Sequence, residues 1–183
     1  MRVITGQARG RKLVTLAGED VRPTPDRVKE AVFSAIQFQV EGRRFLDLFA
    51  GSGQMGIEAL SRGASQAVFV DKSREAAETV KKNLHACGLE QNARVLNMDS
   101  LAFLLQKSEP FGIAFLDPPY GSGLLQKVLP LVAELMAPGG EIFCECPVGE
   151  ELPERAGDFL LCRRYRYGKI SIARYSRKDV TEA

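Results

Sequence analysis

The segment Asp117-Pro118-Pro119-Tyr120 holds the residues of this chain that are best suited to chemistry. It follows an apolar run, residues 111–116, that is typical of a buried strand. Each proline fixes a φ angle and removes a backbone donor, so the strand ends in a stiff turn. This turn presents a carboxylate, free carbonyl oxygens and a flat ring. Such a set can hold a planar nitrogen base by its exocyclic amine, although the same residues can also simply end a strand.

A second pattern, residues 45–56, joins an apolar strand, a loop of small residues and the start of a helix. Glycines in such a loop let a ligand approach the backbone, and the helix N-terminus offers free N–H groups. Gly51, Gly53 and Gly56 match a nucleotide-binding spacing, and Asp71 lies twenty residues after Gly51. We therefore expect Asp71 to bind ribose hydroxyls; the alternative is a solvated acid at a strand end.

Asp47 lies inside this apolar strand, where a carboxylate is costly unless it has a partner. A cationic ligand group would stabilise it, and S-adenosylmethionine has one there whereas NAD has none. Asp47 with Gly51 and Gly53 is similar to the acid-plus-glycine loop of class I methyltransferases, except that Phe49 replaces the first glycine. Asp99 then falls where such enzymes contact the adenine amine, and it is equally suited to cap the following helix.

Length and composition suggest one ordinary soluble domain, with 183 residues, 45% hydrophobic and 26% charged. No apolar stretch is long enough for a membrane span and the start of the chain lacks a secretory pattern, so we expect a cytoplasmic protein. Four cysteines without a CxxC pair, and a single histidine, argue against a zinc site. We therefore expect no metal.

The net charge of +2 conceals two basic segments that contain no acid, residues 1–14 and 163–178. Tyrosines interleave with the second of them. Basic surfaces with aromatic residues are typical of nucleic-acid binding, although a charge run can also be a solvated face. The residues that we expect to contact phosphates are Arg9, Arg11, Lys12, Arg164 and Arg166.

Strand and helix patterns alternate after residue 44, which predicts a parallel sheet with helices on both faces. Strands are expected near 45–49, 67–71, 93–98, 112–116 and 141–146, and helices near 54–62, 74–87, 100–107 and 123–137. Two final strands are expected within 158–176. We expect a short β-hairpin or arm in residues 1–14 and a helix from Thr24 or Pro25 to about Phe38, with Thr24 as its N-cap. Residues 1–40 would be an extension of one compact domain, 41–178.

Taken together, the chain resembles the bacterial 16S rRNA guanine-N2 methyltransferases of the RsmD type. The likeness spans almost the whole chain. The stretches that carry it are Ile4-Thr-Gly6, Arg9-Gly-Arg-Lys-Leu13, residues 22–30, Asp47–Gly53, Gly56–Gly63, the segment 117–120, and Tyr167-Gly168-Lys169 to Tyr175. The segment 117–120 alone is shared with adenine methyltransferases.

The resemblance implies a Rossmann-like α/β fold: a seven-stranded mixed sheet of order 3-2-1-4-5-7-6, with strand 7 antiparallel, helices on both faces, and an N-terminal hairpin and helix. It implies S-adenosylmethionine as methyl donor and the N2 amine of a guanine in 16S rRNA as acceptor. The partner would be the rRNA, within a small-subunit particle. The oligomeric state stays open, with a monomer favoured.

The resemblance also implies roles for individual residues. Asp117 and Pro118 would hold the amine while Tyr120 stacks on the base, with Pro119 stiffening the turn. The expected cofactor ligands are Asp47, Ala50, Gly51 and Gly53 (methionine part), Asp71 and Lys72 (ribose), Asp99 and Ser100 (adenine), and Arg22 and Thr24 (covering the methionine end). Lys29 and Glu30 are expected to be charges on a helix surface.

Three other functions stay open on the residues alone. The chain could be an N6-adenine methyltransferase acting on DNA or RNA, although it shows no target-recognition domain. A nicotinamide-dependent oxidoreductase is disfavoured by Asp47. A non-catalytic RNA-binding module is disfavoured because binding alone requires neither the glycine loop nor the segment 117–120.

Overall fold

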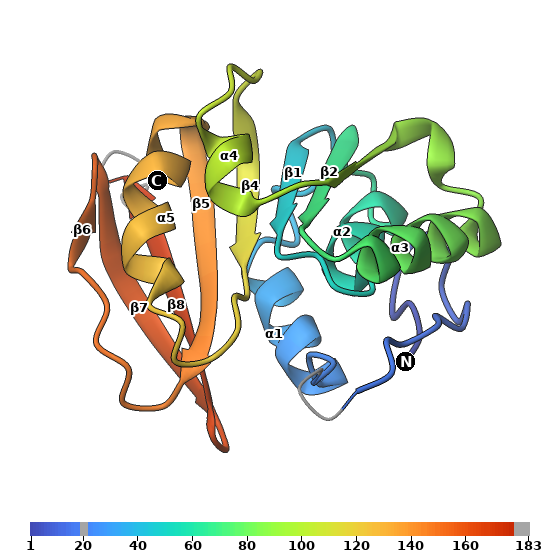
Figure 1. The fold of residues 1–183 in the computed structure, drawn as a ribbon, viewed down its shortest axis with the longest axis horizontal. Coiled ribbons are helices and arrows are strands. Elements are labelled where there is room, and N and C mark those ends of the chain that lie inside the picture. Colours follow the sequence, from blue (N-terminus) through green and yellow to red (C-terminus); the bar gives the residue numbers. More distant parts are fainter. Residues whose placement is uncertain (19–21, 178–183) are drawn as a thin grey trace.

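An eight-stranded sheet organises the computed structural model, which describes residues 1–18 and 22–177 (Figure 1). The strand order is β3-β2-β1-β4-β5-β8-β7-β6. The bounds of the strands are β1 (Arg44–Leu48), β2 (Gln66–Asp71), β3 (Ala93–Asn97), β4 (Phe111–Leu116), β5 (Met136–Pro147), β6 (Arg155–Ala156), β7 (Phe159–Tyr167) and β8 (Ile170–Arg177). Strands β1 to β5 pair in parallel, whereas β8, β7 and β6 join the sheet antiparallel.

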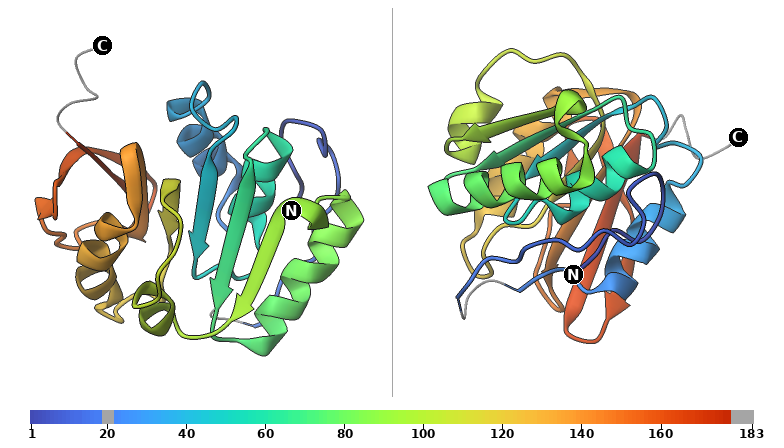
Figure 2. Two further views of the ribbon diagram at one scale, coloured as in Figure 1. Left: turned by 90° about the horizontal axis from the view of Figure 1, so that it is seen from above. Right: turned by 90° about the vertical axis from the view of Figure 1, so that its right-hand side faces the viewer.

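The helices cover the two faces of this sheet in two groups (Figure 2). Their bounds are α1 (Asp26–Ala35), α2 (Gln54–Ser61), α3 (Arg74–Cys87), the 3-10 turn η1 (Glu90–Asn92), α4 (Ser100–Leu104) and α5 (Leu124–Glu134). Strand residues alternate between faces. In β1, Phe45 belongs to the core beneath α1, α2 and α3, whereas Leu46 and Leu48 belong to the core beneath α4 and α5.

The predicted α/β class and the Rossmann-like order of the first five strands are confirmed. The predicted count of seven strands was wrong by one. The additional strand, β6, has two residues and pairs with the start of β7 across the turn Gly157-Asp158, with Gly157 at φ +57°. Two residues are too short for an alternating pattern, so this strand left no sequence signal.

Residues 1–14 form the predicted short hairpin, in which Arg2 and Lys12 make a β-bridge and the N–H groups of Val3 and Leu13 donate to the carbonyls of Arg11 and Met1, at 2.9 and 3.0 Å. We call these residues the N-terminal arm. The backbone N–H groups of Ile4 and Thr5 donate to the carboxylate of Glu58 in α2, at 2.9 and 3.0 Å. The arm is therefore a short hairpin that packs along α2.

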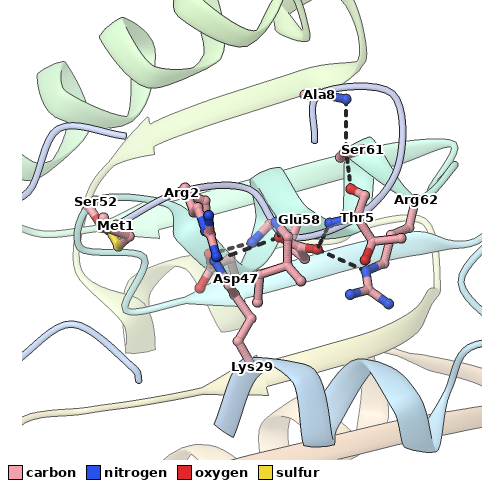
Figure 3. Close-up of polar contacts among 12 residues, drawn as sticks. Met1, Arg2, Thr5, Ala8, Lys29, Asp47, Ser52, Glu58, Ser61 and Arg62 are labelled. Atoms are coloured by element: carbon pink, nitrogen blue, oxygen red, sulfur yellow. Dashed lines mark hydrogen bonds and ion pairs between the residues drawn. The ribbon is translucent and has the colours of Figure 1, made fainter. Parts of the chain in front are cut away.

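Two predictions about α1 and the residues before it were wrong, those for Thr24 and Lys29. The helix begins at Asp26 after Pro25, and Thr24 does not cap it; the Thr24 hydroxyl donates to Glu145 at 3.0 Å instead. Lys29 is not a surface charge but fully buried, with its Nζ donating to the Arg2 carbonyl at 2.8 Å and 3.6 Å from Glu58 (Figure 3). A four-carbon stem allowed Lys29 to cross the interface between α1 and α2.

Other boundaries moved by a few residues. Helix α1 ends at Ala35 instead of Phe38, α4 ends at Leu104 instead of residue 107, and α5 ends at Glu134. Strand β5 starts at Met136 and therefore includes Gly139-Gly140. The last residue of the predicted domain and basic segment, Lys178, lies outside the described residues. No described helix has the length and apolar character that a membrane span requires.

Candidate active site

A cavity of about 840 Å³ lies where β1 to β5 end, at the carboxyl edge of the parallel strands. Open α/β sheets bind ligands at this edge. Of the residues that we assigned to catalysis or cofactor binding, all but one line this cavity: Arg22, Thr24, Asp47, Ala50, Gly51, Asp71, Lys72, Asp99, Ser100, Asp117, Pro118, Pro119 and Tyr120. Sheet topology thus brings together segments that are up to about a hundred residues apart in the chain.

The exception is Gly53, which does not line the cavity. It precedes α2 with φ +81°, and a Cβ at this position would lie 3.0 Å from Val80. Gly51 also has a positive φ, +56°, but a Cβ there would meet nothing within 4 Å. A Cβ on Gly56 would lie 2.3 Å from the Phe69 ring. Gly51 therefore faces the ligand space, whereas Gly53 allows close packing against α3 and Gly56 allows α2 to pack closely on the sheet.

Phe49 occupies the position where the methyltransferase pattern has its first glycine, and its φ is +76°. It is the one non-glycine residue with a positive φ in the described part of the chain. Such a conformation costs an aromatic residue roughly 1–3 kcal/mol. The neighbouring hydrogen bonds hold it, because the N–H groups of Phe49 and Ala50 both donate to the Val70 carbonyl, at 3.0 and 2.9 Å.

Asp47 is 2% exposed, and its Oδ2 accepts a hydrogen bond from the Gly56 N–H at 2.9 Å. Burial raises the pKa of Asp47 to about 7; the Gly56 hydrogen bond opposes this shift and the Asp71 charge adds to it. No cation in the described residues forms a salt bridge with Asp47. The site therefore favours a ligand that brings a positive charge to this carboxylate.

Asp71 and Asp99 are fixed by backbone donors at the edge of the cavity. Asp71 accepts from the Gly51 N–H at 2.9 Å and from the Ser73 N–H at 2.8 Å, so it also holds the glycine loop. Asp99 accepts from Leu101 and Ala102 at 2.9 and 3.2 Å and thereby caps α4. The capping role that the sequence allowed for Asp99 is present together with its position in the cavity lining.

The other side of the cavity is formed by the segment 117–120. Pro118 is buried, whereas Tyr120 is 44% exposed and lines the cavity. Burial raises the pKa of Asp117 well above its usual range, and the charges of Glu145 and Asp47 raise it further. This carboxylate therefore lies close to other acids.

Sequence reasoning missed Glu145, which lies near the end of β5 and lines the cavity at 4% exposure. Its Oε2 accepts from the Thr24 hydroxyl at 3.0 Å, and its Oε1 lies 3.4 Å from the Tyr120 hydroxyl, which donates to it. An acid inside an apolar strand was the signal that identified Asp47, and the same signal was available here. Gln54 was also missed; it is 6% exposed, and its Oε1 has no hydrogen-bond partner among the described residues.

The residues expected to bind RNA do not form one surface. The loop that carries Arg9 is held at Ser61, the last residue of α2, by the N–H groups of Gln7 and Ala8. Because α2 starts at the cavity, this end of the helix points away from it. Arg11 lies near Cys87, at the corresponding end of α3.

The second basic segment lies at the other end of the molecule, in β7 and β8 (Figure 1). Arg164 donates to the Glu150 carbonyl at 3.1 Å, and Arg166 donates to the Gly168 carbonyl at 3.2 Å. The turn between β7 and β8 pairs with the end of β5, because the Val148 N–H donates to the Lys169 carbonyl at 3.0 Å. This turn, unlike the loop that carries Arg9, therefore lies at the carboxyl edge of the sheet.

In the described ranges 1–18 and 22–177, no three or more His, Cys, Asp or Glu side chains are arranged to hold a metal ion.

Comparison with known proteins places this site in a family. The sequence model of the family described as Conserved hypothetical protein 95 matches residues 1–176. The chain belongs to this family, the RsmD family. The resemblance drawn from the residues is thus confirmed. The chain is 37% identical to Ribosomal RNA small subunit methyltransferase D of Escherichia coli K12 over 185 residues, which cover 100% of this chain and 93% of that protein.

Solved structures share the fold of this RsmD family member. The candidate methyltransferase yhhF of Escherichia coli matches with a TM-score of 0.84 and 36% identity, covering 97% of each chain. An RNA methyltransferase of Salinibacter ruber, solved with S-adenosyl-L-homocysteine, matches with a TM-score of 0.67 at 16% identity, covering 88% of this chain and 98% of the other. The architecture is that of class I methyltransferases.

Proposed function

We propose that this protein transfers a methyl group from S-adenosylmethionine to the exocyclic N2 amine of a guanine in 16S rRNA. The observation that carries the proposal is that one cavity is lined both by the acids of the glycine-loop side and by the segment 117–120. A methyl donor and a base amine would meet there. The name of the Escherichia coli relative, a small-subunit rRNA methyltransferase, supports the same reaction class.

The residues present fit the proposed cofactor. Asp47 and the Oε1 of Gln54, which has no partner among the described residues, are buried acceptors on the cavity wall, and the ammonium group of S-adenosylmethionine offers them donors and a positive charge. Asp71 and Lys72 would hold the ribose, Asp99 and Ser100 the adenine. Arg22 and Thr24 would cover the methionine end together with Ala50 and Gly51. When bound, the cofactor supplies an electrophilic methyl group.

Asp117 and the Pro118 carbonyl would act on the amine. The nitrogen lone pair of guanine N2 is delocalised into the ring, so the nitrogen must become more tetrahedral before it attacks. Acceptors aimed at its N–H groups favour that change. Tyr120 would stack on the base, which must be unpaired or leave its own stack. Holding the amine in line with the methyl group contributes through orientation.

The choice of guanine rests on two supports. An ionised carboxylate can accept from both N1–H and N2–H of guanine, whereas adenine offers only its amine on that side. The family resemblance points the same way. N6-adenine methylation is the second candidate, because the segment 117–120 is also found in adenine enzymes.

We propose that the second basic segment contacts the RNA, with Arg164 and Arg166 binding phosphates. Arg9, Arg11 and Lys12 on the N-terminal arm would contribute further phosphate contacts. The substrate would be 16S rRNA within a small-subunit particle in the cytoplasm, bound by a monomer. Residues 1–40 would serve as an extension of the domain that follows.

The test is transfer of a labelled methyl group to rRNA from a strain that lacks this gene, followed by digestion and nucleoside analysis. We expect label in N2-methylguanosine, with a small-subunit particle and free 16S rRNA compared as substrates. Label in N6-methyladenosine would favour the second candidate. Cofactor binding without transfer to either RNA would indicate a non-catalytic module and end the proposal.

A further inference from the structure

Glu145 occupies an unusual place for a carboxylate. In β5, Glu141 and Glu145 lie on the same face as Phe143, toward α1, because alternate strand residues share a face. Both acids are buried, at 2% and 4% exposure. Glu141 is neutralised by Arg174, whose Nε and Nη2 both donate to it at 2.7 Å. For Glu145, by contrast, no salt bridge occurs among the described residues.

The two partners of Glu145 are hydroxyl groups from different parts of the chain. Thr24 comes from the block before α1, 121 residues away in sequence, and Tyr120 comes from the segment 117–120. All three residues line the cavity. A buried carboxylate without a countercharge costs free energy, so this arrangement is not explained by stability. It joins the block before α1, proposed to cover the methionine end of the cofactor, to the segment 117–120 on the substrate side of the cavity.

We propose that Glu145 is a positioning residue for the methyl-accepting base. Its Oε1 holds the Tyr120 hydroxyl, which sets the plane of the ring on which the base stacks, and its Oε2 holds Thr24 so that the block before α1 stays against this side of the cavity. The inference rests on the proposed function, because it assigns Glu145 to the same reaction.

A second consequence concerns the charge of Asp117. The titratable groups that interact with Glu145 are Asp117, Tyr120 and Cys146, and Asp47 interacts with Asp117 from the cofactor side. The Glu145 charge contributes to the raised pKa of Asp117. Replacing Glu145 by a neutral residue therefore lowers the pKa of Asp117, so that the carboxylate is ionised at lower pH.

The experiment compares the wild-type protein with Glu145→Gln, Glu145→Ala, Tyr120→Phe and the double variant Tyr120→Phe/Glu145→Ala. The readouts are kcat and KM for the RNA, and the Kd of S-adenosylhomocysteine by calorimetry. We expect Glu145→Ala to lower kcat/KM for RNA by about 10- to 100-fold, because misplacing a reacting group costs that much. The Kd of S-adenosylhomocysteine should change by less than about threefold, since Glu145 itself is not a proposed cofactor ligand and, of the proposed cofactor residues, only Thr24 loses a hydrogen-bond partner.

The double variant tests whether Glu145 acts through Tyr120. If it does, the double variant is no slower than Glu145→Ala alone, because the hydrogen bond to the hydroxyl is already absent there. Multiplicative losses would overturn this route. In Glu145→Gln, the acid limb of kcat/KM for RNA should also move to lower pH, a shift that a purely structural role does not produce.

Glu141→Gln is the matched control, because it neutralises a buried glutamate on the same strand face but away from the cavity. It should lower the melting temperature, since Arg174 loses its partner, and should leave KM for RNA and the acid limb unchanged. Glu145→Gln should keep or raise the melting temperature, since an uncompensated buried charge is removed. If the wild-type protein transfers the methyl group and Glu145→Gln and Glu145→Ala are equally active, the inference about Glu145 is overturned but the proposed function stands. If the wild-type protein shows no methyl transfer, the proposed function is overturned.

Discussion

The carboxylate of Asp47 accepts a hydrogen bond from the backbone N–H of Gly56 at 2.9 Å, which ties an acid inside β1 to the first turn of α2. This N–H is one of those that a helix start leaves without a partner in the helix. The bond aims the carboxylate at the cavity but supplies no countercharge. The pH dependence of stability follows from this relationship.

Without ligand, Asp47 should make the folded protein less stable as the pH rises. The pKa of Asp47 is raised from 3.8 to about 7 in the folded state. Its contribution to the free energy of unfolding is therefore fully present below the pKa of the unfolded chain and is lost as the pH rises through about 7. The lost contribution is at most on the order of 4 kcal/mol. The measurement is the melting temperature of wild type and Asp47→Asn from about pH 5 to about pH 8.

We expect the melting temperature of Asp47→Asn to increase relative to that of the wild type as the pH rises across this range. The difference reports Asp47 together with its effect on Asp117, whose pKa the Asp47 charge also raises, and both effects have the same sign. S-adenosylmethionine at the upper end of the range should stabilise the wild type more than Asp47→Asn, because its cationic group restores the missing countercharge. A difference between the two proteins that does not vary with pH would contradict the assignment.

Asp117→Asn should lower kcat by about 10²- to 10³-fold, because the amide can no longer accept on both oxygens from the amine in the transition state. The Kd of S-adenosylhomocysteine should remain within about threefold of the wild-type value, since the side chain faces the substrate side. Asp158→Asn, in the exposed turn between β6 and β7, is the control and should behave as wild type. Full activity of Asp117→Asn in a labelled-methyl assay would remove Asp117 from the mechanism.

Glu58→Ala should destabilise the protein by about 3–5 kcal/mol, because it leaves Lys29 as a buried charge without its partner. Glu58 also accepts from the N–H groups of Ile4 and Thr5 and from Arg62 Nε at 3.0 Å (Figure 3). Urea unfolding gives the free energy. Glu78→Ala, which breaks the exposed pair with Lys81, should cost no more than about 1 kcal/mol. Equal losses of unfolding free energy in Glu58→Ala and Glu78→Ala would show that the buried contacts of Glu58 do not hold the arm.

For RNA binding, the two basic segments should differ. Arg166→Ala/Lys169→Ala removes charges beside the carboxyl edge of the sheet, whereas Arg9→Ala/Arg11→Ala removes charges at the far ends of α2 and α3. We expect the first pair to weaken RNA binding more and to reduce the slope of log K against log salt by about 1 for each phosphate that the variant no longer neutralises. Filter binding over a salt series measures both. A larger effect of Arg9→Ala/Arg11→Ala would indicate that the RNA runs along the arm.

Much of the fold was predictable because its signals are local. Apolar runs, glycine turns and alternating strand and helix patterns are written over windows of a few residues, and parallel strands need crossover helices between them. The acids Asp47, Asp71 and Asp99 could be placed at the carboxyl edge of the sheet for the same reason, since each follows or interrupts a strand that is recognisable by itself. The short strand β6 and the exact ends of α1, α4 and α5 could not, because two to three residues carry no periodicity.

The sequence by itself determined the α/β class, the family and most of the assigned residues that line the cavity, because each depends on local patterns, and the strand order followed from the family resemblance. Only the tertiary structure decided the partners of Thr24, Lys29 and Glu145. Thr24 was predicted to cap a helix, whereas in the fold its hydroxyl donates to Glu145 of β5. Lys29 was predicted to lie on a helix surface, whereas in the fold it is buried beside Glu58 of α2. Contacts between segments that lie far apart in the sequence form only when the sheet has assembled, and no local pattern records which side chains they join.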